Sequence, residues 1–182
     1  MKAILLAAGF GTRLRPLTDT IPKCLVPIKG KPLLEIWLDK LANSGFSRII
    51  VNTHYKFQLV QEFIKNSPYQ SIVDTFHEVE LLGTCGTLLA NIDSKNNEEI
   101  LLLHSDNYCG ADINQLLRVH KNRPKNCLMT MMTFNTEKPE TCGIVELEKG
   151  IVTGFHEKVN YNVGNIANGA IYVLSTSLLT SV

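Results

Sequence analysis

The sequence lacks the cysteine and histidine patterns that bind structural zinc or build a disulfide framework. Its five cysteines are an odd number spread between Cys24 and Cys142, and no two of them are spaced as Cys-x-x-Cys. The five histidines likewise show no spacing typical of metal ligands. We therefore expect reduced thiols, as in a cytosol, and neither a zinc site nor a disulfide framework.

Long apolar segments are also missing. The apolar runs, such as residues 3–8 and 100–103, are far shorter than the roughly 20 residues that cross a bilayer. Met1-Lys2 leads directly into a predicted strand, without the apolar region and cleavage site of a signal peptide. The sequence therefore predicts a cytoplasmic protein with no membrane partner.

An excess of charge of either sign is absent as well. The 182 residues carry a formal net charge of +1, whereas a dedicated nucleic-acid binder would normally carry a basic excess. No aromatic stripe offers a platform on which bases could stack. We expect no nucleic-acid partner. With 45% apolar and 19% charged residues, the chain is typical of a globular domain with a full core.

What the sequence does contain is a regular alternation of predicted strands and helices. Strands are expected at 2–8, 48–52, 72–76 and 99–104, and helices at 33–44, 57–65, 84–91 and 112–120. After Pro124 the pattern changes to strands at 127–134, 143–147, 151–156 and 170–174, with a hairpin turn at 148–150. This order predicts an α/β fold, with a Rossmann-like, doubly wound, mostly parallel sheet flanked by helices.

The densest group of candidate binding residues lies in the opening stretch. The first predicted strand ends at Gly9 and Gly11, and the long loop that follows carries Arg13, Arg15 and Lys23. Small residues let backbone N–H groups approach a phosphate closely, and cations add positive charge. The loop therefore predicts a nucleoside triphosphate site at the carboxyl edge of a parallel sheet. A solvated loop face is the alternative interpretation of these cations, above all of Arg15.

Two better-known nucleotide motifs do not fit this loop. No Gly-Lys-Ser/Thr closes it, as the Walker A pattern requires. Leu14 stands where a dinucleotide fingerprint has its third glycine, and Asn52-Thr-His54 stands where that fold has an acidic residue. A dehydrogenase is therefore disfavoured.

A longer motif that includes this loop resembles the signature of a known protein family. Leu6-Ala-Ala-Gly-x-Gly-Thr-Arg-Leu-x-Pro-Leu-Thr18, followed by Pro22-Lys-x-Leu-x-Pro27, resembles the signature of sugar-1-phosphate nucleotidyltransferases (NDP-sugar pyrophosphorylases). Within this family the sequence is most similar to mannose-1-phosphate and heptose-1-phosphate guanylyltransferases. Further matches run through nearly the whole chain: Glu78-x-Glu-x-Leu-Gly-Thr-x-Gly-Thr87, Ser105-Asp106, Gly143-Ile-Val-Glu146, Phe155-x-Glu-Lys158 and Asn168-Gly-Ala-Ile-Tyr172.

The resemblance implies an enzyme that transfers a nucleoside monophosphate from an NTP to a sugar 1-phosphate and releases pyrophosphate. Its catalytic residues would be Arg13 at the departing pyrophosphate, Lys23 at the α-phosphate, and Asp106 as a ligand of the cofactor Mg²⁺. A turn cap is the alternative role of Asp106. The implied nucleotide-binding residues are Leu6, Ala7, Ala8, Gly9, Gly11, Thr12, Arg13, Glu78 and Gly83.

Glu78 lies where the family reads the base. A carboxylate only accepts hydrogen bonds and could take two of them from the N1–H and N2–H₂ edge of guanine, whereas an amide would suit uracil or thymine better. We therefore favour GTP. A solvated glutamate, and a site for UTP, CTP or dTTP with another phosphorylated acceptor, stay open as alternatives.

The second half of the motif implies a sugar-phosphate site. Its residues would be Gly143, Glu157, Lys158 and Asn168, with Cys142 where relatives often have an aromatic residue. We thus expect one catalytic domain over residues 1–182, with a nucleotide-binding half at 1–122 and a sugar-phosphate-binding half at 123–182.

The family pattern also contains a second Mg²⁺-binding aspartate, beyond the Asn168–Tyr172 motif and a further helix. The sequence ends at Val182, before that point, so we expect a catalytic domain shortened at its C-terminus. Metal binding completed in another way, or impaired catalysis, is the alternative. Impaired catalysis would make the chain a regulatory module that binds nucleotide and sugar. A homodimer through the core domain also stays open.

Overall fold

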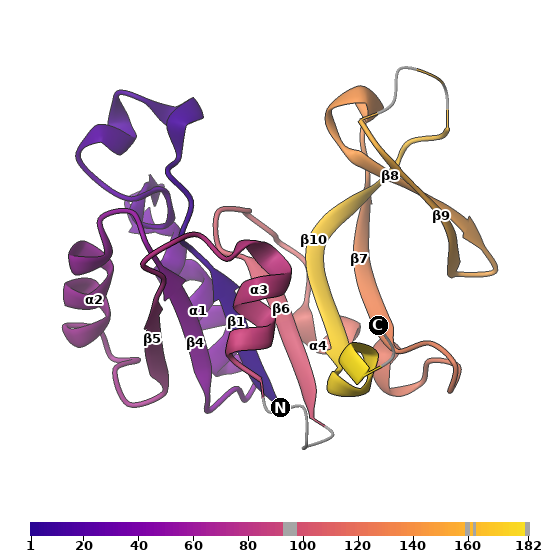
Figure 1. Cartoon of the computed structure of the whole chain (residues 1–182), viewed down its shortest axis with the longest axis horizontal. Coiled ribbons are helices and arrows are strands. Elements are labelled where there is room, and N and C mark those ends of the chain that lie inside the picture. The colour runs from indigo at the N-terminus through magenta and orange to yellow at the C-terminus, as the bar shows by residue number, and fades with distance from the viewer. Residues whose placement is uncertain (93–97, 159–160, 162, 181–182) are drawn as a thin grey trace. The chain divides into compact units, whose positions relative to one another are not determined.

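The computed structural model describes residues 1–92, 98–158, 161 and 163–180. They form two compact units (Figure 1): Met1–Thr130 with Val173–Val182, and Met131–Tyr172. The expected mostly parallel sheet flanked by helices is confirmed. Among the described residues, no helix has both the length and the apolar character needed to span a membrane.

The first unit is built on parallel strands in the order β5-β4-β1-β6. Their bounds are β1 (Lys2–Leu6), β4 (Ile49–Thr53), β5 (Val73–His77) and β6 (Glu99–His104). Residues 3–5 of β1 and residues 100–103 of β6 are buried, as expected for central strands that are covered on both faces. Leu6 pairs with Asn52 on one side and with His104 on the other. The carboxyl ends of three strands therefore meet at one edge.

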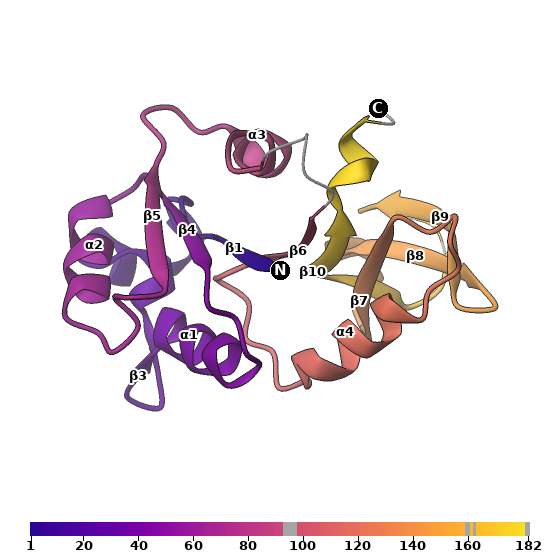
Figure 2. The ribbon, with the colours of Figure 1, turned by 90° about the horizontal axis from the view of Figure 1, so that it is seen from below.

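The helices of this unit are α1 (Leu33–Asn43), α2 (Phe57–Lys65), α3 (Gly83–Ala90) and α4 (Ile113–Lys121). In α1, Leu34, Trp37, Leu38 and Leu41 recur at helical spacing, and all four are buried. Gly45 follows α1 with a φ of +84°, the left-handed conformation in which many helices end. Figure 2 shows α3 on the face of the sheet opposite to α1.

The segment between β1 and α1 is more ordered than the long loop predicted from the sequence. It forms three short 3₁₀ turns, Thr12–Leu14, Leu17–Asp19 and Lys23–Leu25, and then the hairpin of β2 (Pro27–Ile28) and β3 (Lys31–Pro32). The buried Thr18 donates its hydroxyl proton to the Gly11 carbonyl over 2.9 Å. Pro32 directly precedes the first residue of α1.

The second unit is antiparallel. It contains most of β7 (Met129–Asn135) and β10 (Ile166–Ser175), together with β8 (Gly143–Glu148) and β9 (Ile151–Glu157). The predicted turn between β8 and β9 is present, with Lys149 and Gly150 at φ values of 51° and 81°. Two successive positive φ values are typical of a tight hairpin turn whose twist matches that of the strands.

A buried polar cluster joins α4 to β6 and to the start of β7. His120 is almost fully buried, and its Nε2 and Nδ1 lie 2.7 Å from Glu99 Oε2 and 2.9 Å from Thr130 Oγ1. Arg123 donates to Glu99 Oε1 over 2.9 Å and to the Cys127 carbonyl over 2.6 Å. Burial raises the pKa of the Glu99 carboxyl, but the hydrogen bonds from His120 and Arg123 outweigh burial and leave that pKa lowered.

This cluster predicts a loss of stability in acid. A carboxyl whose pKa is lowered by folding stabilises the native state above its unfolded pKa of about 4.3, and this contribution disappears as the pH falls through the folded pKa. Because Glu99 is partly exposed, Glu99→Gln should cost about 1 kcal/mol at pH 7. Urea unfolding at pH 7 and below pH 4 measures the cost, which should shrink in acid. Glu62→Gln, an exposed change on α2, serves as control, and an equal cost at both pH values would contradict the assignment.

Candidate functional site

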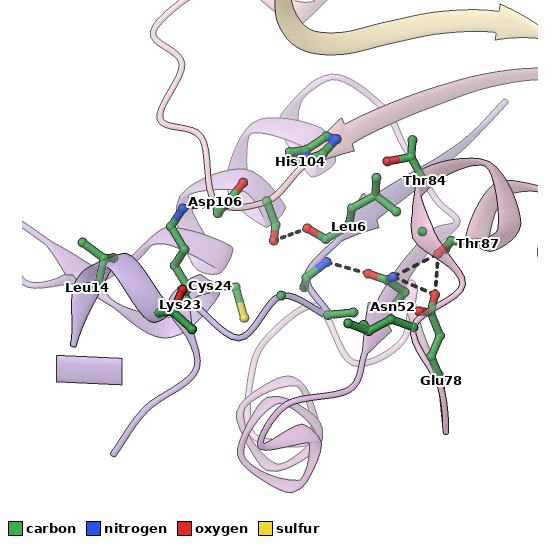
Figure 3. A pocket seen from close by; sticks show the side chains of 18 of the residues that line it. Leu6, Leu14, Lys23, Cys24, Asn52, Glu78, Thr84, Thr87, His104 and Asp106 are labelled. Atoms are coloured by element: carbon green, nitrogen blue, oxygen red, sulfur yellow. Dashed lines mark hydrogen bonds and ion pairs between the residues drawn. The ribbon is translucent and has the colours of Figure 1, made fainter. Parts of the chain in front are cut away.

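A pocket of about 330 Å³ opens at the carboxyl edge of the first unit's sheet (Figure 3). It lies where β1, β4 and β6 end, together with the turns after β1 and the first residues of α3. Its lining contains Leu6, Ala7, Ala8, Gly9, Gly11, Thr12, Arg13, Leu14, Lys23, Cys24, Asn52, Glu78, Leu81, Gly83, Thr84, Thr87, His104, Ser105 and Asp106. Every nucleotide-binding and catalytic residue proposed from the sequence is in this set.

The glycine loop is shaped for close approach of its backbone. Gly11 has a φ of +65°, and a Cβ placed on it would lie 2.9 Å from Thr18 Cγ2 and 3.1 Å from Lys23 Cβ. Only glycine therefore fits this position without a shift of its neighbours. Gly9 has open space around its Cα, with no atom within 4 Å of a built Cβ. The loop thus leaves room for a ligand directly beside its backbone.

Ser105 attaches the start of this loop to the end of β6. Its amide N–H and its hydroxyl both donate to the Leu6 carbonyl, over 3.0 and 2.8 Å. The side chain is fully buried. A glycine at this position could make only the first of these bonds. The serine therefore adds a second attachment immediately before Asp106.

Lys23 and Asp106 form an ion pair in the pocket. Lys23 Nζ lies 2.6 Å from Asp106 Oδ2, and the two side chains are 25% and 33% exposed. The fold thus brings together two residues that are 83 positions apart in the sequence. Each charge neutralises the other, yet both remain accessible to a ligand (Figure 3). A phosphate bound here would meet a cation already positioned by a carboxylate.

The two arginines of the loop differ in their positions. Arg13 lines the pocket. Arg15 is outside the pocket lining, more than half exposed, and its Nε lies 3.2 Å from Asp19 Oδ1. The geometry therefore favours Arg13 as a phosphate contact and Arg15 as part of a solvated loop face.

Glu78 is buried, with 2% of its surface exposed. Its Oε1 accepts hydrogen bonds from Asn52 Nδ2, over 2.8 Å, and from the Thr87 hydroxyl. Its Oε2 accepts from the Leu82 amide over 3.1 Å. Burial alone raises the pKa of the carboxyl, but these hydrogen bonds and the nearby His54 leave it lowered, so Glu78 is ionised at neutral pH. Gly83, which opens α3, has a φ of +70°.

Sequence reasoning did not assign several residues of the pocket. Asn52, near the end of β4, and Thr87, on α3, both donate hydrogen bonds to Glu78. A polar residue directly after the apolar run 49–51 was the available signal for Asn52. Cys24 also lines the pocket, but burial raises the pKa of its thiol to about 12. Cys24 is therefore protonated at neutral pH and unsuited to act as a nucleophile.

The residues proposed for the sugar phosphate lie in the second unit. Gly143 and Glu157 face each other in the β8–β9 register, and a Cβ on Gly143 would lie 2.6 Å from Phe155 Cζ. Lys158 is exposed, and its Nζ lies 3.0 Å from Glu157 Oε1. On β10, Asn168 donates to the Tyr172 hydroxyl over 2.7 Å. The β8–β9 hairpin thus brings Gly143, Glu157 and Lys158 together.

A magnesium ion could use Asp106 as its protein ligand. The described residues contain no group of three or more His, Cys, Asp or Glu side chains that could hold a metal by themselves. Mg²⁺ usually needs only one or two carboxylates when substrate phosphates and water complete its coordination. A single partly exposed carboxylate beside this pocket therefore fits a metal that arrives with the nucleotide.

Known proteins share both the sequence and the fold. The nucleotidyl transferase family model matches residues 2–182. A mannose-1-phosphate guanyltransferase beta-B of Xenopus laevis is 32% identical over 98% of this chain and 51% of its own length. The mannose-1-phosphate guanylyltransferase catalytic subunit beta of Drosophila pseudoobscura pseudoobscura is 34% identical over 98% of this chain and 49% of its own. The chain thus spans about half the length of these curated relatives.

A solved structure agrees with this match. The crystal structure of HddC from Yersinia pseudotuberculosis complexed with GMP-PN has a TM-score of 0.77 and 26% identity. The match covers all of this chain and 79% of that one.

Proposed function

Because the chain belongs to the nucleotidyl transferase family, we propose that it transfers a nucleoside monophosphate from GTP to a sugar 1-phosphate, giving a GDP-sugar and pyrophosphate. The observation that carries this proposal is the Lys23–Asp106 pair beside the glycine loop. The names of the relatives, which are mannose-1-phosphate guanylyltransferases, support guanine and a sugar 1-phosphate.

The proposed reaction is a single in-line displacement. An oxygen of the sugar phosphate attacks the α-phosphorus of GTP, a new P–O bond forms, and the bond to the β-phosphate breaks to release pyrophosphate. Such a reaction needs positioning and charge neutralisation more than covalent chemistry. Backbone N–H groups of residues 9–12 hold phosphate oxygens, Arg13 neutralises the departing pyrophosphate, and Lys23 follows the charge at the α-phosphate. Mg²⁺, held by Asp106 and phosphate oxygens, would neutralise further charge.

Glu78 is the proposed reader of the base. A carboxylate has about four acceptor sites, and three of them on Glu78 are taken by Asn52, Thr87 and Leu82. One site on Oε2 remains, so Glu78 would accept one hydrogen bond from the guanine edge and not the two that we expected from the sequence. Uracil would bind less well, because the two carbonyl groups that flank its single N–H are acceptors and would face an acceptor-only carboxylate.

The proposal also covers the sugar 1-phosphate site, the cellular location and the oligomeric state. Gly143, Glu157, Lys158 and Asn168 would bind the sugar 1-phosphate, so that residues 1–122 serve the nucleotide and 123–182 the sugar. None of the five cysteines, all of which lie in the described part of the chain, forms a disulfide, and this supports a cytoplasmic location. We also propose that the chain forms a homodimer through this catalytic domain.

Pyrophosphate release tests this function. The chain is incubated with Mg²⁺, each of the common NTPs and a panel of sugar 1-phosphates, mannose and heptose included. We expect turnover that is fastest with GTP and that requires the sugar phosphate. Turnover with a different NTP and none with GTP would contradict guanine as the base and identify the base that the site prefers. Nucleotide binding without turnover for any pair would identify a binding or regulatory module and contradict the transferase.

A further inference from the structure

The amide of Asn52 connects two parts of the pocket that are distant in sequence. Its Oδ1 accepts a hydrogen bond from the Ala7 amide over 2.5 Å, at the start of the glycine loop. Its Nδ2 donates to Glu78 Oε1 over 2.8 Å and to Thr87 Oγ1 over 3.2 Å. Only 3% of the surface of Asn52 is exposed. Figure 3 shows dashed lines that join Asn52 to Glu78 and to Thr87.

Only one orientation of this amide satisfies its neighbours. The Ala7 N–H can only donate, and the ionised Glu78 carboxylate can only accept. Rotating the amide by 180° would place two donors together at Ala7 and two acceptors together at Glu78. The Ala7 amide therefore determines that Asn52 turns its NH₂ group toward Glu78. The negative charge on Glu78 in turn fixes the orientation of Asn52 and thereby the position of the Ala7 amide.

The same contacts determine what Glu78 can offer to a base. Asn52 and Thr87 occupy Oε1, so that only Oε2 keeps a free acceptor site. Glutamine at this position would carry one donor and one acceptor end. In either orientation its NH₂ group would face Asn52 Nδ2 or the Leu82 amide, and both of these are donors. The pocket is thus built for a carboxylate at position 78 as long as Asn52 is present.

We propose that Asn52 is the positioning residue that sets the base preference of this pocket, by orienting Glu78 and the Ala7 amide through one buried side chain. This inference rests on the proposed function, since it concerns the nucleotide of that same site. Asn52 itself need not touch the nucleotide. Its hydrogen bonds fix the position of the Glu78 carboxylate, which accepts from the base, relative to the Ala7 amide at the start of the glycine loop.

Exchanging the two functional groups tests the inference. Asn52→Asp places a second carboxylate beside Glu78, and Glu78→Gln places a donor against a donor. Each single change should weaken GTP binding about tenfold or more and lower the preference for GTP over UTP. In the double variant the carboxylate at position 52 can accept from the Ala7 amide and from the new side-chain amide at position 78, whose carbonyl oxygen still accepts from Leu82. The GTP affinity of the double variant should therefore be at least about fivefold higher than the product of the two single effects predicts.

Isothermal titration with GTP and with UTP measures these effects, at a temperature at which circular dichroism shows every variant folded. Asn122→Asp, an exposed asparagine at the end of α4, is the matched control and should change neither affinity. Single effects that simply multiply in the double variant, or an unchanged ratio of GTP to UTP affinity in Asn52→Asp, would overturn the inference. Should Asn52→Asp fail to fold, the recovery of folding and GTP binding in the double variant remains decisive, and its failure overturns the proposal. An unmutated chain that binds no NTP would instead contradict the proposed function.

Discussion

Lys23→Ala is expected to lower kcat for pyrophosphate release by about 10²- to 10³-fold, while KM for GTP changes much less. During an in-line displacement the negative charge moves between oxygens around the α-phosphorus. A flexible ammonium group beside them stabilises the transition state more than the bound nucleotide. Initial rates at saturating sugar 1-phosphate, together with the Kd for GTP, separate the two effects.

The ion pair of Lys23 makes a control necessary. Removing the lysine also leaves Asp106 without its partner at 2.6 Å, so part of any loss could come from a displaced carboxylate. Arg15 lies in the same loop but forms its ion pair with Asp19 on the surface. Arg15→Ala therefore removes a cation without disturbing Asp106, and it should leave kcat within about twofold of the unmutated chain. Turnover that is unchanged in Lys23→Ala would remove Lys23 from the mechanism. A rise in KM without a change in kcat would make it a ground-state contact only.

Whereas the roles of Lys23, Glu78 and Asp106 were predicted only through the family resemblance, local sequence pattern predicted the residues whose role is set by their near neighbours. Gly11 illustrates this, because a left-handed φ and the adjacent Thr18 and Lys23 side chains leave no space for a Cβ. The helix α1 and the central strands were equally predictable, since their apolar spacing and burial agree. In both cases the information lies within a short stretch of chain.

The contacts that the sequence did not reveal span long separations in the chain. Asn52 reaches Ala7 over 45 positions, and Ser105 reaches Leu6 over 99. Periodicity within a segment carries no signal for such pairs. β10 was predicted only in part. We expected a strand at 170–174, yet β10 begins at Ile166, and its early residue Ala167 pairs with Ile144 of β8.

Asp106→Asn should give effects of opposite sign with and without magnesium. In the presence of Mg²⁺, turnover should fall by about 10²- to 10³-fold, because the amide keeps the shape of the side chain but loses the charge that a hard cation requires. Without added metal, GTP should bind severalfold more tightly than to the unmutated chain. Lys23 is then free of its partner, and the carboxylate no longer repels the phosphates. Pyrophosphate release across a Mg²⁺ titration, and GTP titrations in EDTA, measure the two effects.

The opposite signs distinguish a metal ligand from a structural carboxylate. A turn cap at position 106 would tolerate asparagine and would change neither measurement. Asp112→Asn provides that comparison, because Asp112 caps α4 by accepting from the Asn114 amide over 2.9 Å, and asparagine caps equally well. Should Asp106→Asn retain its metal-dependent turnover, Asp106 would be no magnesium ligand. Weaker GTP binding in EDTA would show that the carboxylate positions Lys23 for the nucleotide and does not compete with it.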